Sequence, residues 1–259
     1  MQSLVHGIVL RVVRYSDTRQ IVDLYTREHG RLSVVVAVAG SGGRGRRGGS
    51  AALWRPLNLV EMLLDVRPGR LSWPREPRLY CPYVSLPFHP VKSAVGLFLS
   101  ELLAGALRAE TSEALVYDFV ETSLRWYDGA TSAPHGRGDG PLHSSALANF
   151  HIVFMLRLMR FVGIWPDMAG YKPGWGFDLL GAEWCAQMPP HGWWLAAEES
   201  CWLPLLGRMT YRNMHLFRFT RVGRRRIISV LNEYYRLHLQ PFPELRSLDV
   251  LAEVFDGGR

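Results

Sequence analysis

Arginines interleaved with aromatic side chains are the residues of this chain best suited to bind a ligand. A guanidinium grips phosphate through paired N–H donors, and an aromatic ring stacks on a base. The sequence therefore predicts a nucleic-acid-binding surface in which these arginines contact phosphate and Tyr15 lies among them, with Tyr25, Trp54 and Trp73 interleaved. The arginines, all within the first eighty residues, are Arg11, Arg14, Arg27, Arg31, Arg44, Arg46, Arg47, Arg55 and Arg70.

The distribution of charge favours the same interpretation. Residues 1–80 hold 13 arginines against six acidic residues, whereas residues 81–259 hold 17 residues of each sign. The formal net charge of +7 therefore belongs to the first third of the chain. A basic segment joined to a neutral body is typical of a module that binds a polyanion.

Catalytic and metal-binding motifs are missing from the sequence. It contains no G-x-S-x-G, H-E-x-x-H, Walker A or dinucleotide-binding pattern. The cysteines Cys81, Cys185 and Cys201 lie far apart and form no Cys-x-x-Cys pair, which is the spacing that a thiolate zinc site needs. We therefore expect no enzymatic turnover, no cofactor and no metal, and the scarcity of cysteine fits a reducing compartment.

A second basic cluster lies in residues 208–226, which contain no acidic residue. If a helix begins near Thr220, three of its arginines fall in the first turns, where the helix dipole disfavours cations. An external anion, either DNA or an acidic peptide, would remove that conflict. Neighbouring apolar Met209, Met214, Leu216 and Phe217 favour a peptide, although burial of Met214 and Phe217 is the alternative. The cluster consists of Arg208, Arg212, Arg218, Arg221, Arg224, Arg225 and Arg226.

Strands must position the first set of arginines. Alternating residues predict strands at residues 4–14, 20–26 and 32–38, followed by an apolar strand at 54–66 and a short fifth strand at 70–73. A Gly/Arg-rich loop at residues 40–50 interrupts the series, and residues 80–90 are expected to form a linker. Five short strands with one long loop fit an OB-type barrel, which periodicity does not separate from an SH3-like barrel.

Apolar residues at helical spacing fill the rest of the chain. They predict helices at residues 91–106, 113–126, 147–161, 196–207, 222–239 and 244–255, with an irregular tryptophan-rich insertion at about 165–195. The expected fold class is α+β, with a five-stranded OB-fold barrel at residues 1–80 and an all-α domain at 81–259. The sequence shows neither a membrane span nor a signal peptide, which favours a cytoplasmic protein.

Short motifs occur in a fixed order along nearly the whole chain. The N-terminal ones are Gly7–Leu10, Tyr15–Asp17, Leu24–Thr26, His29–Gly30 and Trp54–Leu57, and the later ones are Pro90–Ser93, Asn149–His151, Phe177–Leu179, Tyr234–His238 and Ser247–Leu251. In order and spacing they resemble the RecO family of bacterial DNA repair and recombination mediators, in its Bacteroidetes-type branch. Many members carry a four-cysteine zinc finger where this insertion holds only Cys185, so we expect tryptophan packing to replace zinc.

The resemblance implies more than the residues do alone. It implies an N-terminal OB-fold, binding of single- and double-stranded DNA, and annealing of complementary strands. It also implies partnership with RecR, contact with the acidic C-terminal tail of single-strand-binding protein, and indirect help to the RecA recombinase. We assign the tail contact to Arg221, Arg224, Arg225 and Arg226. An OB-domain RNA-binding or ribosome-associated adaptor remains the alternative, which equal affinity for RNA and DNA without annealing would favour.

Overall fold

The computed structural model describes residues 2–38, 52–66, 71–109, 111–130 and 140–256, although the side chains of residues 140–146 and 256 lie outside the description. The chain forms two compact units. The first unit comprises residues 1–130 and 245–258, and the second comprises residues 131–244. The division into domains at residues 1–80 and 81–259 stays a prediction, and residue 80 lies next to the end of the β-structure rather than at a boundary between the units.

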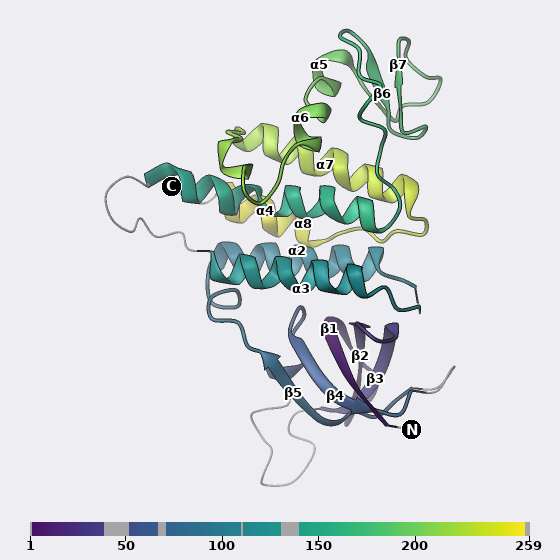
Figure 1. Cartoon of the computed structure of the whole chain (residues 1–259), viewed down its shortest axis with the longest axis vertical. Helices are drawn as coiled ribbons and strands as arrows, with labels where there is room; N and C mark the ends of the chain where they lie inside the picture. Colours follow the sequence, from purple (N-terminus) through teal and green to yellow (C-terminus); the bar gives the residue numbers. More distant parts are fainter. Residues whose placement is uncertain (1, 39–51, 67–70, 110, 131–139, 257–259) are drawn as a thin grey trace. The chain divides into compact units, whose positions relative to one another are not determined.

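Five strands form the barrel of the first unit, and Figure 1 shows them curving around one another. They are β1 (Ser3–Arg14), β2 (Arg19–Thr26), β3 (Gly30–Ala37), β4 (Leu59–Leu64) and β5 (Arg75–Cys81), in the order β3-β2-β1-β4-β5. A parallel bridge between Val34 and Ser72 joins β3 to the chain just before β5. This N-terminal antiparallel sheet, followed by a mostly helical region, confirms the expected α+β fold class with an OB-type barrel.

Strand β1 is buried on both faces, which simple alternation did not predict. Its register with β2 shifts between Val9 and Arg11, so a β-bulge interrupts the alternation of side chains. Val9 therefore packs in the barrel core with Val12 against it, while Ile8 and Leu10 are also fully buried. Helix α2 (Pro90–Ala106) packs against β1, which explains why the strand has no solvent-facing side over this stretch.

The fifth strand was predicted wrongly. It runs from Arg75 to Cys81 rather than over residues 70–73, and it includes the start of the expected linker. Proline normally breaks a strand, but Pro77 lies where the register of β5 with β4 shifts, beside Glu76 at a positive φ of 49°. A bulge on an edge strand tolerates proline because no ladder hydrogen bond is lost there.

Three helices complete the first unit: α2 (Pro90–Ala106), α3 (Ala114–Gly129) and α8 (Ser247–Asp256). Pro90 occupies the first turn of α2, where its missing N–H is not needed. Helix α8 packs on α2, and the Glu101 carboxylate accepts hydrogen bonds from the backbone N–H of Ser247 (2.9 Å) and from its hydroxyl (2.6 Å). The C-terminal segment is thereby fastened to the unit that contains the barrel.

The second unit is built on two long helices, α4 (Gly140–Phe161) and α7 (Arg221–His238). Phe150, Phe154 and Leu158 of α4 are fully buried, as the apolar stripe predicted, and the Tyr235 hydroxyl of α7 donates to the Met155 carbonyl at 2.8 Å. Shorter elements α5 (Ala197–Ser200), α6 (Leu203–Gly207) and the 3-10 turn η1 (Met214–Leu216) connect them. None of the described helices has the length and apolar character that crossing a bilayer requires.

The tryptophan-rich insertion is more regular than expected. It contains a small antiparallel sheet of β6 (Gly176–Asp178), β7 (Glu183–Cys185) and β8 (Trp194–Leu195). The Trp184 ring meets Phe177 and Tyr171 edge-on, each at 5.0 Å between centroids, and its indole N–H donates to the Asp167 carbonyl. Aromatic packing of this kind holds a small sheet together. Among the described residues, no three His, Cys, Asp or Glu side chains are placed to hold a metal ion.

Candidate nucleic-acid interface

The turn between β1 and β2 presents a basic and an aromatic side chain. The backbone N–H groups of Tyr15 and Ser16 both donate to the Arg19 carbonyl, at 3.1 and 3.0 Å, which closes the turn. Tyr15 and Arg14 are highly exposed. Arg14 pairs with Asp17 at 3.0 Å, but both partners are solvated, so a phosphate can compete for this guanidinium.

A second loop meets this turn through Trp73. The guanidinium carbon of Arg19 lies 4.9 Å from the centroid of the Trp73 ring, which is a cation–π contact. Trp73 belongs to the connection between β4 and β5, so the contact joins the two loops that carry ligands in OB-folds. Arg19 was not among the predicted site residues. The rule that these two loops form the binding face would have indicated it.

A buried carboxylate holds Arg11 on the outer face of β1. Asp23 of β2 is paired in register with Arg11 and accepts from its Nε at 2.6 Å and from the Ser33 hydroxyl at 2.5 Å. Burial would raise the pKa of Asp23, but hydrogen bonds from Ser33, Arg11 and Arg31 hold that pKa below its usual range. More than half of the Arg11 side chain is exposed, so the structure presents a fixed guanidinium to solvent.

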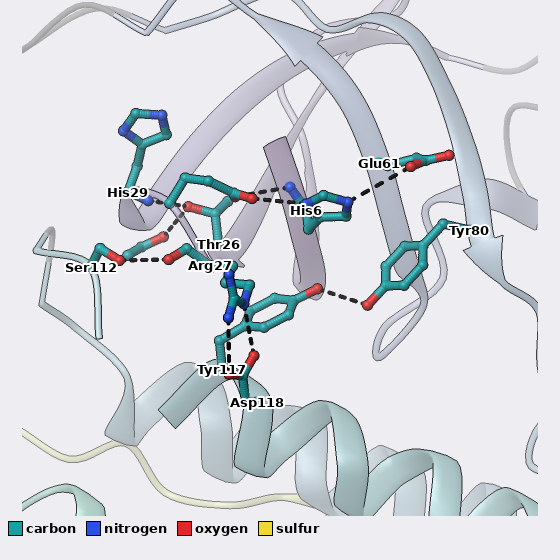
Figure 2. Close-up of polar contacts among 11 residues, drawn as sticks. His6, Thr26, Arg27, His29, Glu61, Tyr80, Ser112, Tyr117 and Asp118 are labelled. Atoms are coloured by element: carbon teal, nitrogen blue, oxygen red, sulfur yellow. Dashed lines mark hydrogen bonds and ion pairs between the residues drawn. The ribbon is translucent and has the colours of Figure 1, made fainter. Parts of the chain in front are cut away.

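Arg27 has an intramolecular partner. Its Nε and Nη2 donate to the two carboxylate oxygens of Asp118 on α3, at 2.8 and 3.1 Å, as Figure 2 shows. The Arg27 hydrogen bond is the main reason that the pKa of Asp118 is lowered. The Ser112 hydroxyl also donates to the Arg27 carbonyl (Figure 2). Fork-to-fork pairing of this kind occupies the face of the guanidinium that would grip phosphate.

Arg31 serves the end of a helix. Its Nη1 donates to the carbonyls of Ala104 and Leu107, at 2.7 and 3.1 Å, and its Nη2 donates to Asp23 at 3.2 Å. Carbonyls at a helix C-terminus lack partners within the helix, so this arginine satisfies the end of α2. DNA contact by Arg27 and Arg31 stays a prediction, but both have structural roles, and we leave them out of the proposed surface.

The remaining predicted residues of the barrel divide into three groups. Arg55 is exposed on the connection that precedes β4. Tyr25 and Trp54, which were interleaved with the arginines in sequence, are buried and belong to the packing of the first unit. Four predicted contacts lie outside the described residues: Arg44, Arg46, Arg47 and Arg70.

The second basic cluster surrounds the start of α7. Thr220 caps the helix by accepting from the Gly223 N–H at 3.0 Å, at the helix start that the sequence predicted. Arg226 forms a bidentate pair with Glu199 at 2.6 and 2.7 Å, and the half-buried Arg224 donates to the Asn149 side chain at 3.2 Å. Arg221, Arg225 and Arg226 are exposed, so these members of the predicted tail contact are accessible to an external anion.

The Asn149 side chain ties this region to α4. Its Nδ2 donates to the carbonyls of Met214 and Phe217, at 3.0 and 2.8 Å, while its oxygen accepts from Arg224. His151, two residues further along α4, is fully buried, and burial together with the charge of Arg224 lowers its pKa to about 3. A neutral His151 avoids adding a second buried charge beside Arg224.

The apolar residues beside this cluster were only partly predicted. Met209 and Met214 are buried in the core of the second unit, so they are unavailable to a peptide, and that part of the prediction is wrong. Met214 is buried because η1, which begins at this residue, packs against α4. Leu216 and Val222, by contrast, are 65% and 79% exposed and flank the helix start. Exposed apolar residues therefore lie near Arg221 and Arg225 in sequence, and one of the two, Leu216, belongs to the predicted set.

The chain is similar to known proteins along nearly its whole length. The family model described as Recombination protein O N terminal matches residues 1–73, and the model described as Recombination protein O C terminal matches residues 142–249. The chain is 40% identical to the DNA repair protein RecO of Phocaeicola vulgatus over 251 residues, covering 96% of this chain and 97% of that protein. The proteins of the same name from Bacteroides fragilis and Porphyromonas gingivalis are 39% and 34% identical, each with 96% of this chain and 98% of the relative covered.

Proposed function

The chain belongs to the RecO family of DNA repair proteins, and we propose that its barrel binds single-stranded DNA and anneals complementary strands during recombination. Membership of the family supports a role in DNA repair and recombination. The observation that carries the finer proposal is the meeting of the β1–β2 turn and the β4–β5 connection at Arg19 and Trp73. Binding without turnover is the chemistry that such a surface supports.

Arginine contacts supply the affinity in this proposal. Arg11, Arg14 and Arg19 lie on β1, on β2 or at the turn between them, in the part of the chain that holds the excess positive charge. Each phosphate neutralised by a cation releases a condensed counterion, so binding weakens as salt rises. Arg55 and the four arginines outside the described residues remain predicted contacts of the same kind.

We expect the double substitution Arg14→Ala with Arg19→Ala to weaken single-strand binding and to slow annealing. Loss of two phosphate contacts should lower the slope of log K against log salt by about 1.4, at roughly 0.7 per contact. Fluorescence anisotropy with a labelled oligonucleotide at several salt concentrations measures this slope. Arg125→Ala is the matched control, since Arg125 is exposed on α3 and pairs with Glu121 at 3.2 Å.

An unchanged slope in the double variant would contradict the assignment of these arginines. The alternative function, an RNA-binding or ribosome-associated adaptor, has its own signature. If the wild-type protein bound RNA and DNA equally and failed to speed the annealing of complementary strands, the adaptor would be favoured. The annealing assay should be run with and without the cognate single-strand-binding protein, because a mediator must act on coated DNA.

We further propose that the start of α7 binds the acidic tail of single-strand-binding protein, and that the protein works with RecR to help load the RecA recombinase. The partnership with RecR and RecA rests on family resemblance. The tail contact also has support from the chain: Leu216, Arg221, Val222 and Arg225, all exposed, lie in the segment that contains the start of α7. A peptide with carboxylates and an apolar end matches that combination of charge and apolar surface.

The double substitution Arg221→Ala with Arg225→Ala should weaken binding of the tail peptide by about tenfold or more, at 1 kcal/mol or so per charge-assisted contact. Binding of naked single-stranded DNA should change less. Arg236→Ala is the control, because Arg236 is exposed near the other end of the same helix. Peptide and DNA titrations of one preparation decide the matter, and a larger loss for DNA than for peptide would assign the cluster to nucleic acid.

A further inference from the structure

Trp73 is the most exposed tryptophan of the chain, at 53% of its surface. Large aromatic rings are normally kept from water, and Trp54 and Trp184 are buried accordingly. Trp73 also lies beside the positive charge of Arg19 rather than within an apolar cluster. An exposed ring next to a cation is the combination used by surfaces that bind single-stranded nucleic acid.

The backbone around Trp73 is clamped, so the ring stands on a rigid part of the barrel. The carbonyl of Ser72 accepts the Val35 N–H at 3.0 Å, which is the bridge that joins this segment to β3. The Ser72 hydroxyl donates to the Asp65 carbonyl at 3.2 Å. An aromatic side chain fixed in this way loses little conformational freedom when a ligand stacks on it.

Arg19 covers part of the ring and leaves the rest to solvent. The Arg19 guanidinium carbon lies 4.9 Å from the centroid of the Trp73 ring, yet more than half of Trp73 stays accessible to solvent. If the only role of Arg19 were to shield the indole from water, we would expect the Trp73 ring to be buried further. The cation instead restrains the ring and places positive charge where the phosphate next to a stacked base would lie.

We propose that Trp73, backed by Arg19, is a stacking platform for one unpaired base of the bound strand. This inference rests on the proposed single-strand binding and adds to it the residue that detects an unpaired base. A base within a duplex is stacked on its neighbours and has no free face, so the platform favours single strands over duplex. Every base has a π-face, so the platform is tolerant of sequence.

The test compares two oligonucleotides of equal length and charge, one of thymidines and one in which abasic spacers replace the nucleosides. Wild-type protein should bind the thymidine strand about tenfold more tightly, the size of effect that one stacked base gives. Trp73→Ala should lose this preference while keeping the salt slope, because phosphate contacts are untouched. Trp73→Phe, which keeps a ring, should retain much of the preference.

Trp193→Ala is the matched control, since Trp193 is 45% exposed but lies in the insertion of the second unit. It should leave the preference unchanged. A preference that survives Trp73→Ala, or wild-type protein that binds both strands equally, would overturn the platform while leaving DNA binding intact. Failure of the wild-type protein to bind either strand would instead overturn the proposed function. A thermal unfolding transition of Trp73→Phe like that of the wild-type protein would show that the barrel of the variant is folded.

Discussion

Replacing Lys92 with Met should lower the free energy of unfolding of the first unit by about 3 kcal/mol, because it removes donors from several buried acceptors at once. Lys92 is only 2% exposed. Its ammonium donates to the Ser85 hydroxyl at 2.7 Å, to the Asp128 carbonyl at 2.8 Å and to the Ala130 carbonyl. These carbonyls belong to the C-terminal end of α3, so one side chain of α2 completes the end of its neighbour.

The charges at this junction explain why a methionine at position 92 should be destabilising. The Asp128 carboxylate accepts from the backbone N–H groups of Val84, Ser85 and Leu86 at 2.9, 2.8 and 2.6 Å. Burial would raise the pKa of Asp128, but hydrogen bonds from these N–H groups hold that pKa below its usual value. Burial lowers the pKa of Lys92, and the charge of the Asp128 carboxylate opposes that shift. Loss of the cation leaves the Asp128 and Ala130 carbonyls with fewer donors and removes the positive charge near the partly buried Asp128 carboxylate.

Urea unfolding, monitored by hydrogen exchange of the α2 amides, measures the loss of unfolding free energy in the first unit. The chain offers a matched control in its other lysine, Lys172, which is exposed and lies 4.3 Å from the centroid of the Trp175 ring. Lys172→Met should change stability by only about 0.5 kcal/mol. Equal small effects for both lysines would show that the α2–α3 junction does not depend on Lys92.

Regular periodicity made most elements predictable, and its interruptions made the others hard to predict. The stripes of α2, α4 and α7 repeat every three or four residues, and the predicted helices correspond to them. Strand β1 was found as a strand, but its bulge at Val9–Arg11 changes which residues share a face. Strand β5 was misplaced because Pro77 normally ends a strand, and only its bulge in pairing with β4 makes room for it.

The candidate site was predicted by residue type rather than by partner. Charge counting located the arginines, but it could not show that Arg27 pairs with Asp118, 91 residues away, or that Arg31 reaches Ala104, 73 residues away. Such long-range partners are created by the fold. Conversely, the contact of Arg19 with Trp73 depends on the closing bridge at Ser72, which no local pattern reveals.

Gly30→Ala should lower the free energy of unfolding of the first unit by about 3 kcal/mol, for two separate reasons. Gly30 has a φ of +67°, which an alanine adopts only with strain. A Cβ atom there would also lie 2.7 Å from the Ala109 carbonyl oxygen and closer still to that of Thr111. The turn between β2 and β3 approaches the α2–α3 connection this closely because the Arg31 N–H donates to the Ala109 carbonyl at 2.9 Å.

Two other glycines separate these reasons. Gly163 has a φ of +76° with open space around it, so Gly163→Ala should cost the second unit only about 1 kcal/mol of strain. Gly129, in α3, has neither a positive φ nor a neighbour within 4 Å, so Gly129→Ala should stabilise by about 0.5 kcal/mol. Hydrogen exchange of each unit measures all three variants, and a cost for Gly30→Ala no larger than that for Gly163→Ala would show that the close approach contributes nothing.

The Gly30 substitution also bears on function, because the two ends of the β2–β3 pair have different roles. Thr26 pairs with Gly30 at the end that docks on the α2–α3 connection, whereas Arg19 pairs with Ala37 at the other end. Since the proposed DNA surface includes Arg19 and Trp73, single-strand affinity of Gly30→Ala should stay within about twofold of wild type under conditions where the variant is folded. A loss of affinity as large as that of Trp73→Ala would mean that the docked end of the hairpin takes part in binding, and that Arg27 or Arg31 contacts DNA after leaving its partner.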